Sequence, residues 1–215
     1  MIHVLISTVG GCGVSTMARD FAREAKGLLI EGSNRTRVQD LFIDEAPDAI
    51  DDYMDFLRGK PVAEVAISGD GYDLIQGNIF HDLEEIGEAD FKRAVENLGD
   101  DDVFVDLSRY RDEDILDWAQ VADRFYCVLV NRPGSLRAYD RIRFILRKNK
   151  CAVPVAVVLN RLKPGDKEAM EAAEGLDLCD ALYFYERENP AFSLNGEYAA
   201  EKGEKKSFWS FFKGR

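Results

Sequence analysis

The stretch Ser7–Thr16 reads STVGGCGVST and lies between an apolar run, Ile2–Ile6, and a helix-forming stretch, Met17–Ala25. A buried strand, a glycine-rich turn, a Ser-Thr pair and a helix, in that order, make the context that a phosphate-binding loop requires. The glycines let backbone N–H groups curl around an anion, and the following helix points its positive end at the same place. The stretch therefore predicts an anion cradle, with a plain strand-to-helix connection as the alternative.

The predicted cradle lacks its usual charge. The ordinary form of such a loop ends in Gly-Lys-Ser/Thr, and the lysine reaches the terminal phosphates. Here Val14 stands at the lysine position, between Gly13 and Ser15. We therefore expect a loop that keeps its backbone donors and has lost the cation that holds the end of a phosphate chain.

The bulk composition limits the classes of protein to consider. The chain has 215 residues, with 46% hydrophobic and 32% charged residues, which suits one folded domain with a large core. A net charge of -12 argues against broad nucleic-acid binding. The spacing of the four cysteines fits neither a CxxC pair nor a metal site, which favours structural thiols in a reducing cytosol. They are Cys12, Cys127, Cys151 and Cys179.

Short apolar runs rich in Val and Ile alternate with helical patterns along the chain. Continuous apolar runs are typical of parallel strands that are covered on both faces. The expected strands are Ile2–Ile6, Gly27–Ile30, Tyr72–Ile75, Val103–Val105, Phe125–Val130, Val153–Leu159 and Leu182–Phe184. The expected helices are Met17–Lys26, Asp48–Leu57, Asp90–Asn97, Glu113–Ala119, Leu136–Lys148 and Lys167–Gly175. This alternation predicts an α/β fold, with a mainly parallel sheet and helices on both faces, over 1–195.

The glycine loop resembles the deviant loop of the ParA/MinD family of ATPases, which reads Lys-Gly-Gly-x-Gly-Lys-Ser/Thr-Thr. In that register Val9 and Val14 replace the two lysines, whereas the glycines and the Ser-Thr pair match. The resemblance implies a P-loop NTPase fold that binds ATP or ADP with Mg²⁺, and a homodimer. The loop residues implied to bind the nucleotide are Gly10, Gly11, Cys12, Gly13, Val14, Ser15 and Thr16.

The second strand leads into a segment that resembles the family's Asp-x-Asp switch. Glu31 matches the first acidic place, which lies near the metal, and Ser33 falls where the second acid would orient the attacking water. A serine cannot accept a proton from that water as a carboxylate does. Arg37 and Asp40 match an Arg-x-x-Asp feature of the MinD branch. A plain polar loop over 31–40 is the alternative.

Two later strand ends carry the remaining implied site residues. Asp106 ends the run VFVD and resembles the family's metal-binding aspartate, which would act together with Ser15; a helix-capping aspartate is the alternative. Asn160 ends the run VAVVLN and resembles the asparagine that reads the adenine edge, with Arg161 beside it; the alternative is a turn residue. An asparagine amide suits a purine because it offers a donor and an acceptor together.

A polar tail over 196–215 ends in a predicted amphipathic helix. Lysines flank an aromatic cluster made of Phe208, Trp209, Phe211 and Phe212. A short basic helix with aromatics on one face is typical of a peripheral membrane anchor, and MinD-like proteins end in such a helix. A helix that docks on a protein is the alternative. We therefore expect a cytoplasmic protein that lies at the inner face of the cell membrane.

The replaced residues point to a function without efficient catalysis. Val9, Val14 and Ser33 fall on groups that would neutralise or hydrolyse the γ-phosphate, so we assign no catalytic residue. The sequence favours a nucleotide-binding positioning or scaffold factor for a cell-surface, secretion or division machine, comparable to atypical pilus localisation factors of the family. Its protein partner is unidentified. The alternative is a weak but genuine Mg²⁺-dependent ATPase, and a DNA-partitioning ATPase is disfavoured by the acidic charge.

Overall fold

A computed structural model of the chain describes residues 1–32, 37–43, 51–78, 86–99, 101–161 and 163, and the backbone of 181–185. In this part of the chain a single eight-stranded sheet has the order β3-β4-β2-β5-β1-β6-β7-β8. The strands are β1 (Ile2–Ser7), β2 (Leu28–Glu31), β3 (Ile67–Ser68), β4 (Asp73–Ile75), β5 (Val103–Leu107), β6 (Arg124–Leu129), β7 (Val155–Asn160) and β8 (Ala181–Tyr185).

Seven of these strands are parallel, and the short edge strand β3 runs antiparallel to β4. The register places Leu5 of β1 opposite Asp106 of β5, and Ser7 opposite Val128 of β6. Because the strands are parallel, their carboxyl ends lie along one edge of the sheet, where ligands of open α/β sheets gather. The loop that follows β1 begins at this edge.

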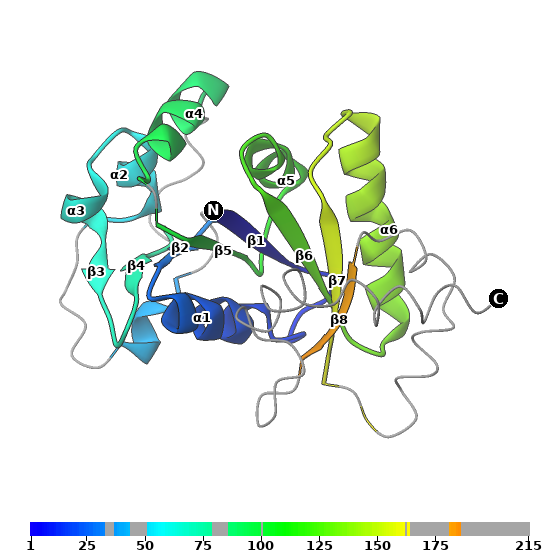
Figure 1. Cartoon of the computed structure of the whole chain (residues 1–215). Helices are drawn as coiled ribbons and strands as arrows, with labels where there is room; N and C mark the ends of the chain where they lie inside the picture. Colours follow the sequence, from blue (N-terminus) through cyan, green and yellow to red (C-terminus); the bar gives the residue numbers. More distant parts are fainter. Residues whose placement is uncertain are drawn as a thin grey trace, which may run out of the picture.

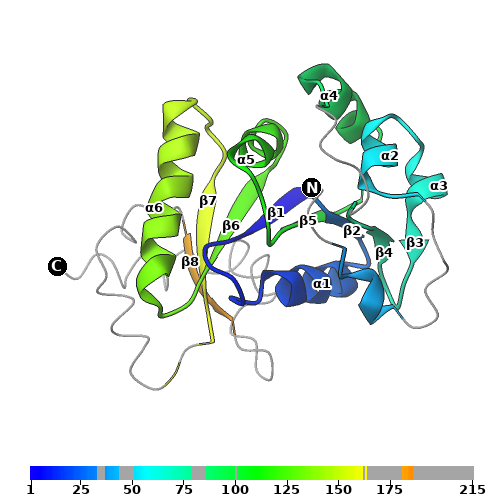
Figure 2. The same ribbon diagram turned by 180° about the vertical axis from the view of Figure 1, so that it is seen from behind.

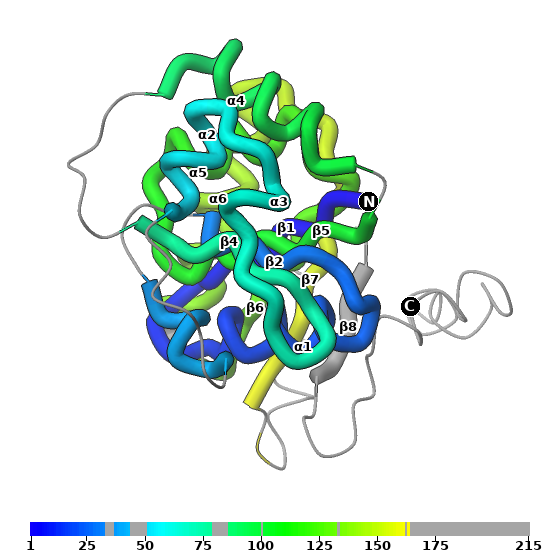
Figure 3. Tube along the Cα trace, turned by 90° about the vertical axis from the view of Figure 1, so that its left-hand side faces the viewer, coloured from blue at the N-terminus to red at the C-terminus, as the bar shows by residue number. Residues whose placement is uncertain are grey.

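Helices cover both faces of the sheet, as the alternating pattern predicted (Figure 1). One face of the sheet carries α1. The other face carries α5 and α6, and α2 to α4 lie beside them toward the β3 edge. The view from behind shows the same layers (Figure 2). Viewed from the β3 end, α1 lies below the sheet and α2 and α4 lie above it (Figure 3). The elements are α1 (Val14–Ala25), the 3-10 helix η1 (Asp40–Phe42), α2 (Tyr53–Leu57), α3 (Val62–Val65), α4 (Glu88–Glu96), α5 (Asp112–Ala119) and α6 (Pro133–Lys148).

The sheet separates two hydrophobic clusters. On the α1 side Met17 and Phe21 pack on Leu5, Phe104 and other strand residues that point to that face. On the opposite side α2, α4, α5 and α6 pack on the alternate strand residues. Successive residues of a strand point to opposite faces, so near-continuous apolar strands are what a sheet buried on both faces needs.

The predicted strands are confirmed, with bounds that shift by up to two residues. The predicted helix Asp48–Leu57 is wrong at its start, because 51–52 is not helical and α2 begins at Tyr53. The carboxylate of Asp52 accepts hydrogen bonds from the backbone N–H groups of Met54 and Asp55, and this capping box begins the helix there. The short elements β3, α3 and η1 were not predicted, and the expected helix Lys167–Gly175 lies outside the described residues.

The fully buried ring of Trp118 joins α5 to the helices beside it. Its ring centroid lies 5.1 Å from that of Phe91 on α4 and 6.4 Å from that of Tyr53 on α2. We expect Trp118→Ala to lower the free energy of unfolding by about 3–5 kcal/mol, because it opens a large cavity. Phe144→Ala is the matched control, since that ring is 63% exposed. Equal losses for the two variants in chemical denaturation would contradict this account of the core.

Candidate functional site

The loop between β1 and α1 has the backbone of an anion cradle. Gly11 (φ 75°) and Gly13 (φ 96°) adopt left-handed conformations that side chains with a Cβ rarely tolerate. Gly10 and Gly11 are exposed, and a Cβ added to either would meet no atom within 4 Å. Gly13 is the N-cap residue of α1, so the first N–H groups of this helix face the loop. This arrangement leaves room and backbone donors for an anion.

Asn160 lies directly against the loop and leaves no space for a side chain at Gly13. A Cβ on Gly13 would come within 2.5 Å of Asn160 Nδ2. That nitrogen donates to the carbonyl of Cys12 at 2.8 Å, and Oδ1 accepts from the backbone N–H of Arg161 at 2.7 Å. These bonds use one of the two amide protons and one of the two oxygen lone pairs. The amide keeps a donor and an acceptor for a ligand.

The two valines at the lysine positions face the core. Val14 is 2% exposed and belongs to the cluster on the α1 side of the sheet, and the partly buried Val9 packs against the same cluster. Apolar contacts therefore hold the loop at the two places where the related loops carry a charge.

Hydrogen bonds tie the start of the loop to both neighbouring strands. The Thr8 hydroxyl donates to the carbonyl of Val128 at 2.8 Å and lies 2.6 Å from the hydroxyl of the fully buried Ser135. On the β5 side, the Ser7 hydroxyl donates to the carbonyl of Ser108 at 2.7 Å. Because buried bonds of this kind are costly to break, the loop has a defined position relative to β5 and β6.

Asp106 lies near the carboxyl end of β5, next to the loop and close to Ser15. Its Oδ1 accepts from the backbone N–H of Ser108 at 2.9 Å, and the Ser15 hydroxyl is also a hydrogen-bond donor to this carboxylate. Burial raises the pKa of Asp106, against the effect of these donors. A hydroxyl and a carboxylate oxygen form the type of donor set that Mg²⁺ prefers, so Ser15 and Asp106 fit such an ion.

Gln39 joins this pair and was not singled out by the sequence. Its fully buried amide nitrogen donates to Asp106 Oδ2 at 2.9 Å and to the backbone carbonyl of Ser15 at 2.8 Å. Its Oε1 accepts from Arg19 at 3.2 Å, which sets the orientation of the amide. The amide N–H cannot coordinate a cation, and it occupies one acceptor position on Asp106 Oδ2 beside the proposed metal pair. A glutamine in a polar loop carries no sequence signal for this contact.

Glu31 lies at the end of β2 and holds the segment that contains Gln39. Its Oε1 accepts from the backbone N–H groups of Val38 and Gln39 at 2.8 and 3.1 Å, and its Oε2 accepts from that of Gly77 at 2.9 Å. Burial raises the pKa of Glu31 to about 7, and the nearby Asp106 adds to this effect. The expected Arg37–Asp40 pair is an ion pair of 2.9 Å. Ser33 lies outside the described residues.

The described residues contain no group of three or more His, Cys, Asp or Glu side chains that could hold a metal ion. Within the same ranges the cysteines are separate thiols at Cys12, Cys127 and Cys151, as their spacing predicted, and Cys179 lies outside the description. No helix in this part of the chain has the length and hydrophobicity needed to cross a bilayer. The predicted tail helix also lies outside the described residues.

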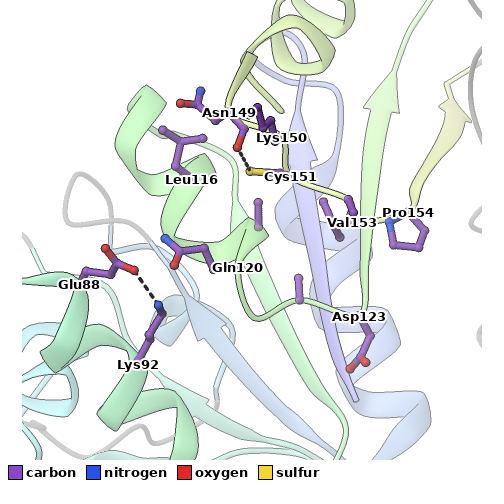
Figure 4. Close-up of a pocket in the computed structure, with 13 residues that line it drawn as sticks. Glu88, Lys92, Leu116, Gln120, Asp123, Asn149, Lys150, Cys151, Val153 and Pro154 are labelled. Atoms are coloured by element: carbon purple, nitrogen blue, oxygen red, sulfur yellow. Dashed lines mark hydrogen bonds and ion pairs between the residues drawn. The ribbon is translucent and has the colours of Figure 1, made fainter. Parts of the chain in front are cut away.

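A pocket of about 860 Å³ lies at the opposite edge of the sheet (Figure 4). It is lined by residues just before β6 and β7, including Asp123 and Pro154, and by Glu88 and Lys92 of α4. Glu88 and Lys92 form an ion pair of 2.6 Å, so the charges near this pocket are partly neutralised. Because parallel strands place their amino ends here, the pocket is separate from the glycine loop.

Solved structures with the same fold are ParA and MinD proteins. The chain matches a plasmid partition protein from Borrelia burgdorferi bound to AMPPNP with 19% identity and a TM-score of 0.67, over 93% of each chain. It matches the septum site-determining protein MinD from Pyrococcus horikoshii, complexed with Mg-ADP, with 16% identity and a TM-score of 0.63, over 88% of this chain and 86% of that one.

A ParA family ATPase from Chlorobium tepidum matches with 15% identity and a TM-score of 0.72, over 95% of this chain and 93% of that one. No family model and no curated protein matches the sequence. The expected fold is therefore confirmed by structure: this chain has the P-loop NTPase fold of the ParA and MinD ATPases.

The raised pKa of Glu31 predicts a pH-dependent contribution to stability. The unfolded chain releases this proton near pH 4.5, whereas the folded chain holds it to about pH 7. The contribution of Glu31 to the free energy of unfolding is therefore fully present below pH 4.5. It falls by up to about 3 kcal/mol as the pH rises to about 7. We expect the difference in unfolding free energy between the wild type and Glu31→Gln to shrink by a similar amount over this range.

Denaturant unfolding of both proteins across the pH range measures this difference. His3, whose pKa is lowered by burial to about 4, acts in the opposite direction, but it is present in both proteins and cancels. Glu64→Gln is the matched control, because Glu64 is exposed. A difference between the wild type and Glu31→Gln that stays constant from pH 4.5 to pH 7 would show that the folded carboxyl titrates normally.

Proposed function

We propose that this chain is a divergent ParA/MinD-like protein that binds an adenine nucleotide, hydrolyses it poorly or not at all, and acts as a positioning or scaffold factor at the membrane. The observation that carries the proposal is the open glycine loop, with Gly10 and Gly11 exposed and the N-terminus of α1 behind them. Backbone N–H groups at a helix N-terminus bind phosphate without help from side-chain charge. The fold that places this loop supports the same proposal, since neighbours with that fold carry AMPPNP or Mg-ADP.

The nucleotide-binding residues follow from this placement. The phosphates lie against the loop, whose proposed binding residues are Gly10, Gly11, Cys12, Gly13, Val14, Ser15 and Thr16. Asn160 lies against the loop at the end of β7 and takes the base side of the site, and Arg161 follows it beside the loop. Ser15 and Asp106 are the proposed metal pair. When bound, Mg²⁺ would neutralise charge on the phosphates, and the Gln39 amide that donates to Asp106 lies beside this pair.

Poor hydrolysis follows from the groups that surround the loop. Val9 and Val14 add no charge to stabilise a transition state that spreads over the phosphate oxygens. Beside Asp106 lies the neutral amide of Gln39, which cannot act as a general base. The carboxylate of Glu31 is already bonded to three backbone N–H groups and is therefore unsuited to orienting a water.

The alternative, a weak but genuine ATPase, needs basic residues in place of the missing lysines. Two candidates, one on α1 and one in the segment after β2, are engaged elsewhere. Arg19 bonds to Gln39 and stacks on the ring of Phe42 at 3.8 Å, and Arg37 pairs with Asp40. These contacts favour the scaffold role over the enzyme, and a turnover measurement separates the two.

The membrane part of the proposal rests on the tail. The aromatic cluster Phe208, Trp209, Phe211 and Phe212 with its flanking lysines matches an interfacial helix in composition. One short anchor binds reversibly, so a homodimer, which carries two of them, would bind a membrane far more tightly. The proposed location is the inner face of the cell membrane, and the partner is a protein of a cell-surface, secretion or division machine.

Nucleotide binding and turnover on one purified sample test the central proposal. We expect calorimetry to detect ATP or ADP in the presence of Mg²⁺, and a steady-state assay to detect little or no hydrolysis. Gly13→Val should abolish binding, because φ 96° and the 2.5 Å approach of Asn160 Nδ2 exclude a side chain. Turnover at the rate of ordinary family members, lost in Gly13→Val, would replace the scaffold role with an enzymatic one. No binding at millimolar nucleotide would reject the site.

Vesicle sedimentation tests the membrane anchor. The intact chain should bind vesicles that contain anionic lipid and should bind them more weakly as salt rises, since each lysine near the surface contributes about 1 kcal/mol. Replacing Trp209 and Phe212 with serine should abolish the binding. Phe144→Ser is the control, as it removes an exposed aromatic from α6. Equal sedimentation of the tail variant and the control, or no sedimentation of the intact chain, would leave the tail as a protein-docking helix.

A further inference from the structure

We propose that Arg132 and Arg161 supply the positive charge that the loop lacks at Val9 and Val14, and that these two arginines bind the phosphate chain of a nucleoside polyphosphate. The inference rests on the proposed nucleotide site and deepens it. It concerns how a loop without either lysine holds an anion in a protein whose net charge is -12.

Arg132 lies beside the first valine position. It is the N-cap residue of α6, in the segment that follows β6, and its Nη1 donates to the carbonyl of Gly10 at 3.4 Å. A Cβ added to Gly134 would lie 3.5 Å from Val9 Cγ1, so the segment around Arg132 packs against the start of the loop. The guanidinium is exposed and makes a long bond, which a phosphate oxygen can replace with a stronger one.

Arg161 lies beside the second valine position. Its Nε is 3.7 Å from the place that a Cβ on Gly13 would occupy, next to Val14. Its backbone has φ 55°, which non-glycine residues rarely adopt, and its N–H is held by Asn160 Oδ1 at 2.7 Å. The asparagine that bonds to the loop therefore also directs this arginine to the loop.

Neither guanidinium group has a carboxylate partner within the described ranges, in contrast to Arg37 and Arg141. Arg37 pairs with Asp40, and Arg141 pairs with Asp112 at 3.0 Å. Charges that are not neutralised by the protein are available to a ligand. A planar guanidinium donates two parallel hydrogen bonds to a phosphate, which suits it to replace a lysine at this task.

The topology explains why residues so distant in sequence can share this role. β1 lies between β5 and β6, and β7 lies beyond β6, so the segments that follow β1, β6 and β7 leave the same edge of the sheet. The glycine loop supplies the backbone donors from the first of these segments. The other two supply one arginine each, on the side of the loop opposite Asp106 and Gln39.

Calorimetric titration of the full chain with ATP tests the inference. Arg132→Gln and Arg161→Gln should each weaken ATP binding about tenfold, as loss of a charge-assisted hydrogen bond does, and the double variant should lose more. The effect should be larger for ATP than for AMP and should diminish at high salt. Arg147→Gln is the matched control, because it removes an exposed arginine from the last turn of α6, far from the Arg132 end.

A rescue experiment separates a charge effect from a change of loop shape. Arg132→Lys and Arg161→Lys should bind ATP more tightly than the glutamine variants, because each keeps a cation beside the loop. If Arg132→Gln and Arg161→Gln bind ATP as tightly as the wild type, the proposed role of Arg132 and Arg161 is overturned and the proposed nucleotide site stays intact. Absence of ATP binding by the wild type would overturn both.

Discussion

The parallel pairing of β1 with β5 on one side and β6 on the other is the constraint on which the rest of the structure depends. Both faces of β1 are buried, so its register cannot slip without exposing Val4 or Leu5 and disrupting two hydrophobic clusters. That register brings the ends of four strands to one edge, with Asp106 on one side of the glycine loop and Asn160 on the other. The site is a consequence of this pairing.

Next to the loop, a buried polar network occupies the place where a metal ion would act. Gln39 bridges Asp106 and the backbone of Ser15, and Glu31 holds Gln39 through its backbone N–H. Two acidic groups with raised pKa values thus lie within one network, stabilised by amide donors in place of a cation. A displacement of Gln39 would therefore disturb its contacts with both Asp106 and Glu31.

The positive charge around the loop comes from neighbouring segments and not from the loop itself. Val9 and Val14 belong to or pack on the core, and the arginines at the loop come from the ends of β6 and β7. Under the proposed function, this arrangement keeps an anion site in an acidic protein without a cation at either valine position. Binding and hydrolysis make different demands on the same loop, because only hydrolysis needs charge where the transition state develops it.

The sequence alone determined the order of the main strands and helices, because continuous Val- and Ile-rich runs favour buried parallel strands and the glycine stretch Ser7–Thr16 favours a tight turn between a strand and a helix. The resemblance to the ParA/MinD loop and aspartate implied that Ser15 and Asp106 would act together, and the two residues lie close to each other in the structure. The start of α2 could not be read from periodicity, because Asp52 caps the helix through its side chain.

Only the tertiary structure decided the surroundings of the loop. The roles of Gln39 and Arg132 depend on which strand ends are neighbours, and strand order in a parallel sheet is set by long-range packing and not by local pattern. A glutamine or an arginine in a polar segment looks the same in the sequence whether it faces solvent or a ligand. Gln39 and Arg132 are distinguished by their hydrogen-bond partners Asp106 and Gly10, which lie 67 and 122 positions away in the sequence.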